Sequence, residues 1–236
     1  MSVASATSGE SRVAVAFSGG LDSSVLTACA AKRVEVVACT AFAEGSGDKA
    51  RAKEAASALG VELVATVLTK ENVSEALATL RLPFAPTLMD RSLWCLYTVV
   101  SRAAQGTGAR VMLLGQLADE LFGGYAKYAE ALEKSGSEAA SAMMAGDVGD
   151  YAKRGRVRDI GACGGRVEPR FPFEAKEVVD LASTLPVSVK IREGVRKAVL
   201  RRAATELGVP EALAAAGKKA AQYSSGVQKL VAGLPF

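Results

Sequence analysis

The sequence contains no histidine. This absence excludes Ser-His-Asp and Cys-His catalytic triads, histidine-ligated zinc, and histidine as a general acid or base. Cysteine is scarce as well, with four residues and no C-x-x-C pair, so neither a zinc ribbon nor a thioredoxin-type site is expected. Cys29 and Cys39 lie among apolar neighbours, and we expect both to be reduced core residues.

Long apolar runs are also lacking. No stretch approaches the roughly 18 apolar residues of a membrane-spanning helix, and the opening MSVASATSGESR lacks the apolar core of a signal peptide. We therefore predict a cytoplasmic protein that makes no membrane contact. Lys and Arg total 29 against 25 Asp and Glu, a net charge of +4. This mild basicity suits an anionic ligand such as a nucleotide, and does not by itself indicate nucleic acid.

What is present is an ordinary globular composition, with 236 residues of which 50% are hydrophobic and 23% charged. Short apolar runs alternate with helical patterns in the first half. The alternation predicts an α/β fold, a doubly wound parallel sheet of about five strands with helices on both faces. In such sheets ligands bind at the carboxyl ends of the strands. Four strands are expected at 12–17, 34–42, 61–68 and 109–115.

The chain divides into three parts by composition. We expect residues 1–11 to form a flexible N-terminal tail, 12–125 the α/β core, and 126–236 a mostly helical part that completes the site. Within the last part, 156–174 (RVRDIGACGGRVEPRFPFE) is loop-like because of its glycines and prolines. Helices are expected at 126–160, 174–185, 194–207 and 210–216.

The strongest motif is SGGLDSS at Ser18–Ser24, between the first expected strand and a helix. Glycines allow close approach of the backbone to a ligand, and the hydroxyls, N–H groups and helix N-terminus together form an anion cradle. Asp22 would repel bare phosphate, but fits if a magnesium ion bridges it to phosphate oxygens. The alternative is a tight turn in which Asp22 caps the helix.

A second motif, LLGQLADELFGGY, spans Leu113–Tyr125 at the end of the fourth expected strand. Asp119 and Glu120 would reach the same edge of the sheet as the first motif. Two carboxylates beside phosphates again imply magnesium. The alternative is an acidic helix start favoured by the helix dipole.

These motifs carry a family resemblance. The first resembles the pyrophosphate-binding loop of the ATP pyrophosphatase (PP-loop) superfamily, and the second resembles L-S-G-E-G-A-D-E-L-F-G-G-Y of the asparagine synthetase family. The similarity runs in order over nearly the whole chain from Arg12, and implies an adenine nucleotide alpha hydrolase-like fold with ATP bound by 12–125. Four further segments resemble that family: Cys39–Glu62, Arg166–Pro186, Arg196–Arg201 and Lys218–Val227.

The resemblance implies roles for single residues, with ATP and Mg²⁺ as cofactors. It assigns Asp22 and Asp119 as magnesium ligands, Glu120 as an acidic active-site residue, and Lys197 as a phosphate contact; a solvated helix lysine is the alternative for Lys197. Nucleotide-binding roles are implied for Ser18, Gly19, Gly20, Leu21, Asp22, Ser23, Ser24, Ala41 and Gly115.

Several positions depart from the family pattern. Gln116 stands where the family has a glutamate thought to accept a proton from ammonia, and an amide cannot act as a base. Another group or water then serves, or the acceptor chemistry differs. Leu117 replaces a glycine, Leu114 a serine, and Pro172–Ala175 replaces P-F-L-D. These changes cluster where the acceptor would bind.

The resemblance implies an AMP-forming ligase. It would adenylate a small-molecule carboxylate, with aspartate as a candidate, release pyrophosphate, and form an amide with ammonia. Glutamine-dependent members carry an N-terminal glutaminase domain that begins with a nucleophilic cysteine, whereas residue 2 here is Ser2. We therefore expect free ammonia, a separate ammonia-supplying subunit, or a different nucleophile.

Two other functions remain open. A tRNA-modifying PP-loop enzyme would adenylate a base carbonyl, with 153–158 and 201–202 as phosphate contacts, although no aromatic stripe accompanies them. A sulfur-transferring version would need Cys95 and Cys163 as its pair. The third candidate is a non-catalytic nucleotide-binding subunit. Trp94 and Tyr97 are expected on a helix core face, or as an acceptor-pocket wall, and a homo-oligomer is left open.

Overall fold

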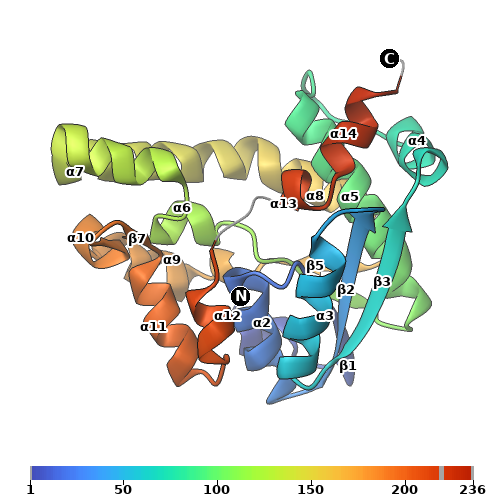
Figure 1. Ribbon diagram of the computed structural model, residues 1–236, viewed down its shortest axis with the longest axis horizontal. Coiled ribbons are helices and arrows are strands. Elements are labelled where there is room, and N and C mark those ends of the chain that lie inside the picture. The colour runs from blue at the N-terminus through green and yellow to red at the C-terminus, as the bar shows by residue number, and fades with distance from the viewer. Residues whose placement is uncertain (1, 218–220, 235–236) are drawn as a thin grey trace.

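The computed structural model describes residues 2–217 and 221–234 (Figure 1). Its centre is a five-stranded parallel sheet with the order β3-β2-β1-β4-β5. The α/β expectation is confirmed. The strands are β1 (Arg12–Ala16), β2 (Glu35–Ala43), β3 (Glu62–Leu68), β4 (Val111–Leu113) and β5 (Glu168–Arg170).

The strands of the sheet centre are apolar on both sides because helices cover both faces. Val13 and Val15 of β1 pack with α2 (Leu21–Ala31) and α3 (Asp48–Ala58). Ala14, which points the other way, packs with α5 (Leu88–Gly106) and α14 (Val227–Ala232). A parallel strand covered on both faces reads as a continuous apolar run, which is what RVAVA is.

The connections create a ligand site at one place on the sheet edge. The chain passes from β1 through β2 to β3 on one side, then returns through α4 (Lys70–Ala78) and α5 to β4 on the other side of β1. The loops after β1 and β4 therefore diverge in opposite directions. Such a switch point leaves a crevice at the carboxyl ends of the strands.

The remainder of the chain is mostly helical. Its longest helical element, α7, extends past the sheet in Figure 1 and is broken at Gly136, whose φ of +84° and ψ of 178° are not helical. A short antiparallel hairpin, β6 (Ile191–Arg192) with β7 (Val195–Arg196), interrupts the helices. The helical elements are α6 (Ala118–Phe122), α7 (Ala126–Asp150), the π-helical turn η1 (Tyr151–Gly155), α8 (Arg156–Cys163), the 3-10 turn η2 (Pro172–Glu174), α9 (Lys176–Thr184), α10 (Val187–Lys190), α11 (Ala198–Glu206), α12 (Glu211–Ala215) and α13 (Ala221–Ser224).

Two local expectations differ from the structure. The segment 156–174 contains helix α8 and strand β5 rather than loop throughout. Gly161 lies within α8, where a Cβ would come within 2.6 Å of the ring of Trp94, so this glycine serves helix packing and not a turn. Strand β5 is not among the strands expected from the sequence, because it has only three residues and includes Pro169. A proline can occupy an edge strand such as this one.

The N-terminal segment also differs from the expected flexible tail. Residues Val3–Ala6 form helix α1, with Ser2 accepting a hydrogen bond from the backbone of Ser5 as its cap. Ala6 is fully buried, and its carbonyl accepts a hydrogen bond from Arg170 at 2.8 Å. This turn packs against α2.

Two further observations concern which residues the structure describes and what they contain. Across residues 2–217 and 221–234 there is no helix with the length and apolar character that crossing a membrane requires. The family-like segment Lys218–Val227 begins at residues 218–220, which lie outside the described residues.

Candidate active site

The loop after β1 is a compact set of hydrogen bonds around two serines. Ser18 Oγ accepts from the backbone N–H of Gly20 at 3.3 Å, and Ser23 Oγ donates to the carbonyl of Gly20 at 3.1 Å and accepts from the N–H of Ser18 at 3.3 Å. Helix α2 begins immediately afterwards, with Gly20 as its cap. The N-terminus of an eleven-residue helix thus faces the crevice with its positive end.

Gly19 allows this loop to fold tightly. Its φ is +67°, a left-handed conformation, and a Cβ there would lie 3.0 Å from the carbonyl oxygen of Arg51 on α3. Arg51 in turn donates from Nε to the carbonyl of Ser18 at 3.1 Å. The side chain of Arg51, on α3, therefore supports the loop after β1 from the side opposite to β4.

Lys197 bridges the two carboxylates that the sequence motifs supply. Its Nζ lies 2.5 Å from Oδ1 of Asp22 and 2.8 Å from Oδ1 of Asp119. The lysine is 3% exposed, whereas the carboxylate side chains keep 24% and 18% of their surface. Burial acts to lower the pKa of Lys197, but Asp22 and Asp119 outweigh it and hold the pKa above its usual value. The amine is therefore a permanent cation near neutral pH.

The backbone places Lys197 in this position at some conformational cost. The residue has φ of +57°, in the left-handed region that non-glycine residues seldom adopt, and it forms the N-cap of α11 directly after the β6–β7 hairpin. Gly124 leaves the space for it, because a Cβ there would lie 2.4 Å from Cε of Lys197. Strain of this kind is typical of functional sites.

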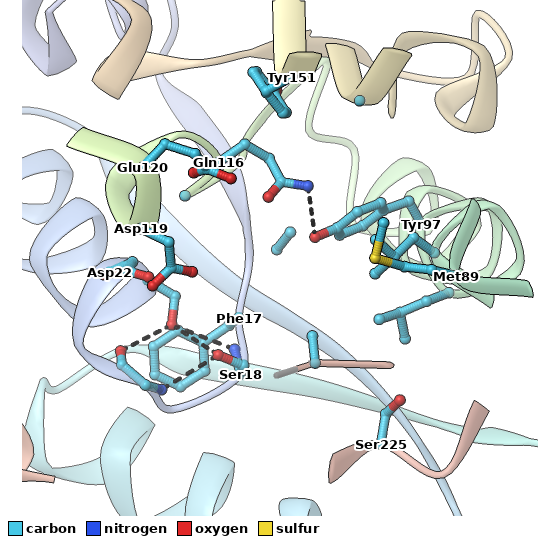
Figure 2. A pocket seen from close by; sticks show the side chains of 18 of the residues that line it. Phe17, Ser18, Asp22, Met89, Tyr97, Gln116, Asp119, Glu120, Tyr151 and Ser225 are labelled. Carbon is cyan, nitrogen blue, oxygen red and sulfur yellow. Dashed lines mark hydrogen bonds between the residues drawn. The ribbon is translucent and has the colours of Figure 1, made fainter. Parts of the chain in front are cut away.

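These groups line one pocket of about 610 Å³ at the carboxyl ends of β1, β2 and β4. Figure 2 shows Asp22 and Asp119 beside Ser18 on one side of it, and Gln116 and Tyr97 on the other. Ala41 of β2 and Gly115 after β4 also form part of the lining. A Cβ on Gly115 would lie 3.2 Å from Cβ of Asp22, so the glycine lets the two loops come together.

Glu120 lies beside this group but is largely buried. It is 8% exposed, and it accepts a hydrogen bond from the hydroxyl of Tyr125 at 2.8 Å. Burial and the neighbouring carboxylates raise the pKa of Tyr125, so the tyrosine remains a protonated donor. Glu120 is thereby held at the pocket wall by a fixed partner.

A second charged cluster belongs to the opposite wall, where Asp90 and Arg158 line the pocket. Arg158, 4% exposed, donates from Nε to Asp159 at 2.8 Å and from Nη1 to Asp90 at 3.1 Å. Asp159 is fully buried and accepts from Nε2 of Gln116 at 2.6 Å. The same amide nitrogen donates to the hydroxyl of Tyr97 at 3.1 Å. Gln116 is thus tied to α5 and α8 as well as to its own loop.

The model of the family described as asparagine synthase matches residues 1–162 and 156–234 of the chain. The chain belongs to the asparagine synthase family. This family is of the ATP pyrophosphatase type. The crevice and its serine- and glycine-rich loop lie at the carboxyl ends of the strands, where open α/β sheets bind their ligands.

Two curated relatives illustrate the match. A Methanocaldococcus jannaschii protein described as a glutamine-hydrolysing asparagine synthetase is 29% identical over 94% of the chain and 47% of its own length. The mouse asparagine synthetase domain-containing protein 1 is 33% identical over 61% of the chain and 26% of its own length. The chain therefore spans about half or less of the length of these relatives.

Among solved structures, the U34-tRNA thiolase of Methanococcus maripaludis aligns over 95% of the chain and 73% of its own, with 15% identity and a TM-score of 0.38. A likeness at this level carries no argument about fold or function.

The structure brings most of the sequence-predicted site residues together. Ser24, which is fully buried, and Gly19, which packs against α3, do not line the pocket. The predicted residues that do line the pocket are Ser18, Gly20, Leu21, Asp22, Ser23, Ala41, Gly115, Gln116, Asp119, Glu120 and Lys197.

Other lining residues were missed or misjudged. Arg51 lines the pocket, and a basic residue within an alanine-rich helix gives no signal of this. Arg201, a candidate phosphate contact for tRNA, lines the pocket as well. Tyr97 faces the pocket, as the wall alternative has it, while Trp94 is buried and donates to the carbonyl of Ala76 at 3.1 Å. Arg158 was a candidate phosphate contact for tRNA, but it is enclosed between Asp90 and Asp159.

Proposed function

We propose that this chain is an ATP- and Mg²⁺-dependent ligase that adenylates a small-molecule carboxylate, releases pyrophosphate, and then forms an amide with ammonia or another amine. The single observation that carries the proposal is the Lys197 ammonium between Asp22 and Asp119 at the mouth of the serine-rich loop. Fixed charge at this point lies where pyrophosphate charge would develop. Aspartate is our first candidate for the carboxylate.

The donor set fits a magnesium ion bound together with phosphates. Within the described residues no group of three or more His, Cys, Asp or Glu side chains could hold a metal by itself. Mg²⁺ is usually bound by one or two carboxylates plus phosphate oxygens, and Asp22 and Asp119 supply two carboxylates that retain exposed surface. When bound there, the ion would neutralise phosphate charge and help to orient the triphosphate.

The chain's own residues would do the remaining work by position and charge. Ser18, Ser23 and the N–H groups at the start of α2 would bind the β and γ phosphates. Lys197 would stabilise the negative charge that grows on pyrophosphate as the carboxylate oxygen attacks the α phosphorus. Ala41, at the end of β2, would pack against the nucleoside side of the ligand.

A pyrophosphate-release assay tests this function. Purified protein with MgATP is given aspartate plus ammonium, ammonium without a carboxylate, a panel of other carboxylates, or bulk tRNA. We expect pyrophosphate and AMP in equal amounts that depend on a carboxylate. Lys197→Met and Asp22→Ala should each lower the rate by about 10²–10³-fold, the typical effect of losing one such charge contact.

The control is Lys176→Met, which removes an exposed lysine that pairs with Asp180 on α9 and should leave the rate unchanged. Pyrophosphate formed with tRNA and with no carboxylate would move the protein to the tRNA-modifying class. Wild-type protein that binds no ATP in a titration calorimeter would overturn the proposal.

A further inference from the structure

The wall opposite the phosphate loop is built around one amide. Gln116 lines the pocket in the connection between β4 and α6, the helix that carries Asp119. Its Nε2 uses both hydrogens within the protein, one toward Asp159 at 2.6 Å and one toward the hydroxyl of Tyr97 at 3.1 Å. The amide nitrogen is therefore fully occupied.

The partners fix which way the amide faces. Asp159 Oδ1 accepts from Arg158 Nε at 2.8 Å, and the charge of Arg158 opposes the rise in the pKa of Asp159 that burial causes, which favours a carboxylate here. If the amide were reversed, its carbonyl oxygen would face a carboxylate oxygen, an arrangement with no shared proton. The carbonyl oxygen therefore faces the pocket, as Figure 2 shows for Gln116 beside Tyr97.

A buried charged network supports the hydrogen bonds that hold the Gln116 amide. Asp159 is fully buried, Arg158 is 4% exposed, and Arg158 also contacts Asp90 at the start of α5. Asp90 closes a capping box with Thr87, which fixes the start of α5. Breaking such a buried network leaves a charge without compensation, so its geometry resists change.

We propose that Gln116 orients the amine nucleophile: Asp159 and Tyr97 hold its amide so that the carbonyl oxygen accepts a hydrogen bond from an N–H of the amine. This inference rests on the proposed function and specifies its second substrate. Gln116 binds the amine but takes no proton from it, because an amide has no basic site in the working pH range. Asp159 is a positioning residue, which acts through Gln116.

The reaction balances without a base at this position. The amine lone pair forms the C–N bond, the bond between the acyl carbon and the phosphate oxygen breaks, and AMP leaves with that electron pair. The proton lost from nitrogen passes to water. Only the free amine can react in this way, so the rate follows the fraction of nucleophile that has already lost its proton.

A pH series with two amines tests the inference. Amide formation is measured at saturating MgATP and carboxylate with ammonium or hydroxylamine as the varied nucleophile. We expect kcat/KM for the amine to rise tenfold per pH unit and to level off at the pKa of that amine's conjugate acid. The inflection should therefore move to lower pH with hydroxylamine, the weaker base. An inflection at the same pH for both amines would mean that an enzyme group accepts the proton, and would overturn the inference.

The hydrogen bond between Gln116 and Asp159 is tested by exchanging its donor and acceptor. Gln116→Glu places a carboxylate against Asp159 and should lower stability, while Gln116→Glu with Asp159→Asn restores a donor–acceptor pair and should recover most of that loss. Asp159→Asn by itself should raise KM for the amine about tenfold, near the value of one hydrogen bond, with a smaller change in ATP–pyrophosphate exchange. Asp180→Asn, an exposed carboxylate on α9, is the matched control.

The two proposals fail in different ways. Absence of pyrophosphate with every carboxylate would overturn the proposed function, and the unfolding measurements would still test the hydrogen bond between Gln116 and Asp159. Strictly additive effects of Gln116→Glu and Asp159→Asn on unfolding would overturn the inference whatever the activity.

Discussion

The pocket is flanked by two charged clusters, each with a cation between two carboxylates; in the second, Arg154 also contacts Asp90, at 3.2 Å. Lys197 lies between Asp22 and Asp119, and Arg158 lies between Asp90 and Asp159. The clusters differ in exposure. The carboxylates of the lysine cluster keep 24% and 18% of their side-chain surface, while those of the arginine cluster keep 3% and 0%.

This difference separates a site that exchanges partners from one that holds a shape. A lysine is a compact point charge, and carboxylates that retain contact with water can turn toward an incoming cation or ligand. An arginine presents a rigid fork whose hydrogen bonds fix the partner orientation. We infer that the first cluster serves the chemistry, and that the second sets the position of Gln116.

Removing each cation should separate the two clusters most clearly. Arg158→Met should lower the free energy of unfolding by about 3–5 kcal/mol, because it leaves two buried carboxylates without their shared partner. Lys197→Met should cost less stability, because water can reach Asp22 and Asp119. Urea denaturation of both variants measures the contrast.

The matched control for that experiment is Arg202→Met, which removes an exposed pair with Glu206 on α11. Its cost should stay below about 1 kcal/mol. Equal losses for Arg158→Met and Lys197→Met would contradict the assignment of different roles to the two clusters.

The lysine cluster can also be disturbed without changing any charge. In Gly124→Ala the new Cβ would lie 1.8 Å from Oδ1 of Asp119 and 2.4 Å from Cε of Lys197, so at least one of the two must move. A displacement near 1 Å in a positioned site costs about 10²-fold in rate. We expect a loss of that size in pyrophosphate formation.

Gly146→Ala in α7 is the control, because a Cβ there would meet nothing within 4 Å. If Gly124→Ala left the rate of pyrophosphate formation as high as Gly146→Ala does, the position of Lys197 between Asp22 and Asp119 would be irrelevant to the reaction.

The lysine cluster could be anticipated from the sequence and the arginine cluster could not. Asp22 and Asp119 lie in long motifs at the ends of two strands, and parallel strands bring their carboxyl ends to one edge. Lys197 was named through a short, ordered resemblance, yet its contact with Asp22, across 175 residues, is visible only in the structure. The functional roles of these residues remain predictions.

The arginine cluster depends on features that have no local pattern. Arg158 and Asp159 fall where the helix expected at 126–160 overlaps the segment 156–174, whose glycines indicate loop, and within α8 Gly161 leaves room for the ring of Trp94. Strand β5 and the β6–β7 hairpin are likewise too short for periodicity to reveal them. The central sheet, in contrast, was predictable because its strands are continuous apolar runs between turn signals.

The stability that the buried arginine cluster contributes through the Asp90 carboxylate should depend on pH. Burial acts to raise the pKa of Asp90, but hydrogen bonds from Thr87 and the charge of Arg158 outweigh it and hold the pKa below its ordinary value of 3.8. A carboxylate with a lowered pKa contributes stability that is complete above the pKa of the unfolded chain and is lost as pH falls through the folded value.

Asp90→Asn should therefore cost about 1.5–3 kcal/mol at neutral pH, as for a hydrogen bond to a charged group. The difference from wild type, measured by urea denaturation in steps of pH, should shrink as pH falls below about 4. The exposed control Asp180→Asn should differ little from wild type at neutral pH, because surface pairs contribute little. A difference for Asp90→Asn that stayed constant down to the acid limit would show that the carboxylate charge does not stabilise the cluster, and that Asp90 acts there by shape.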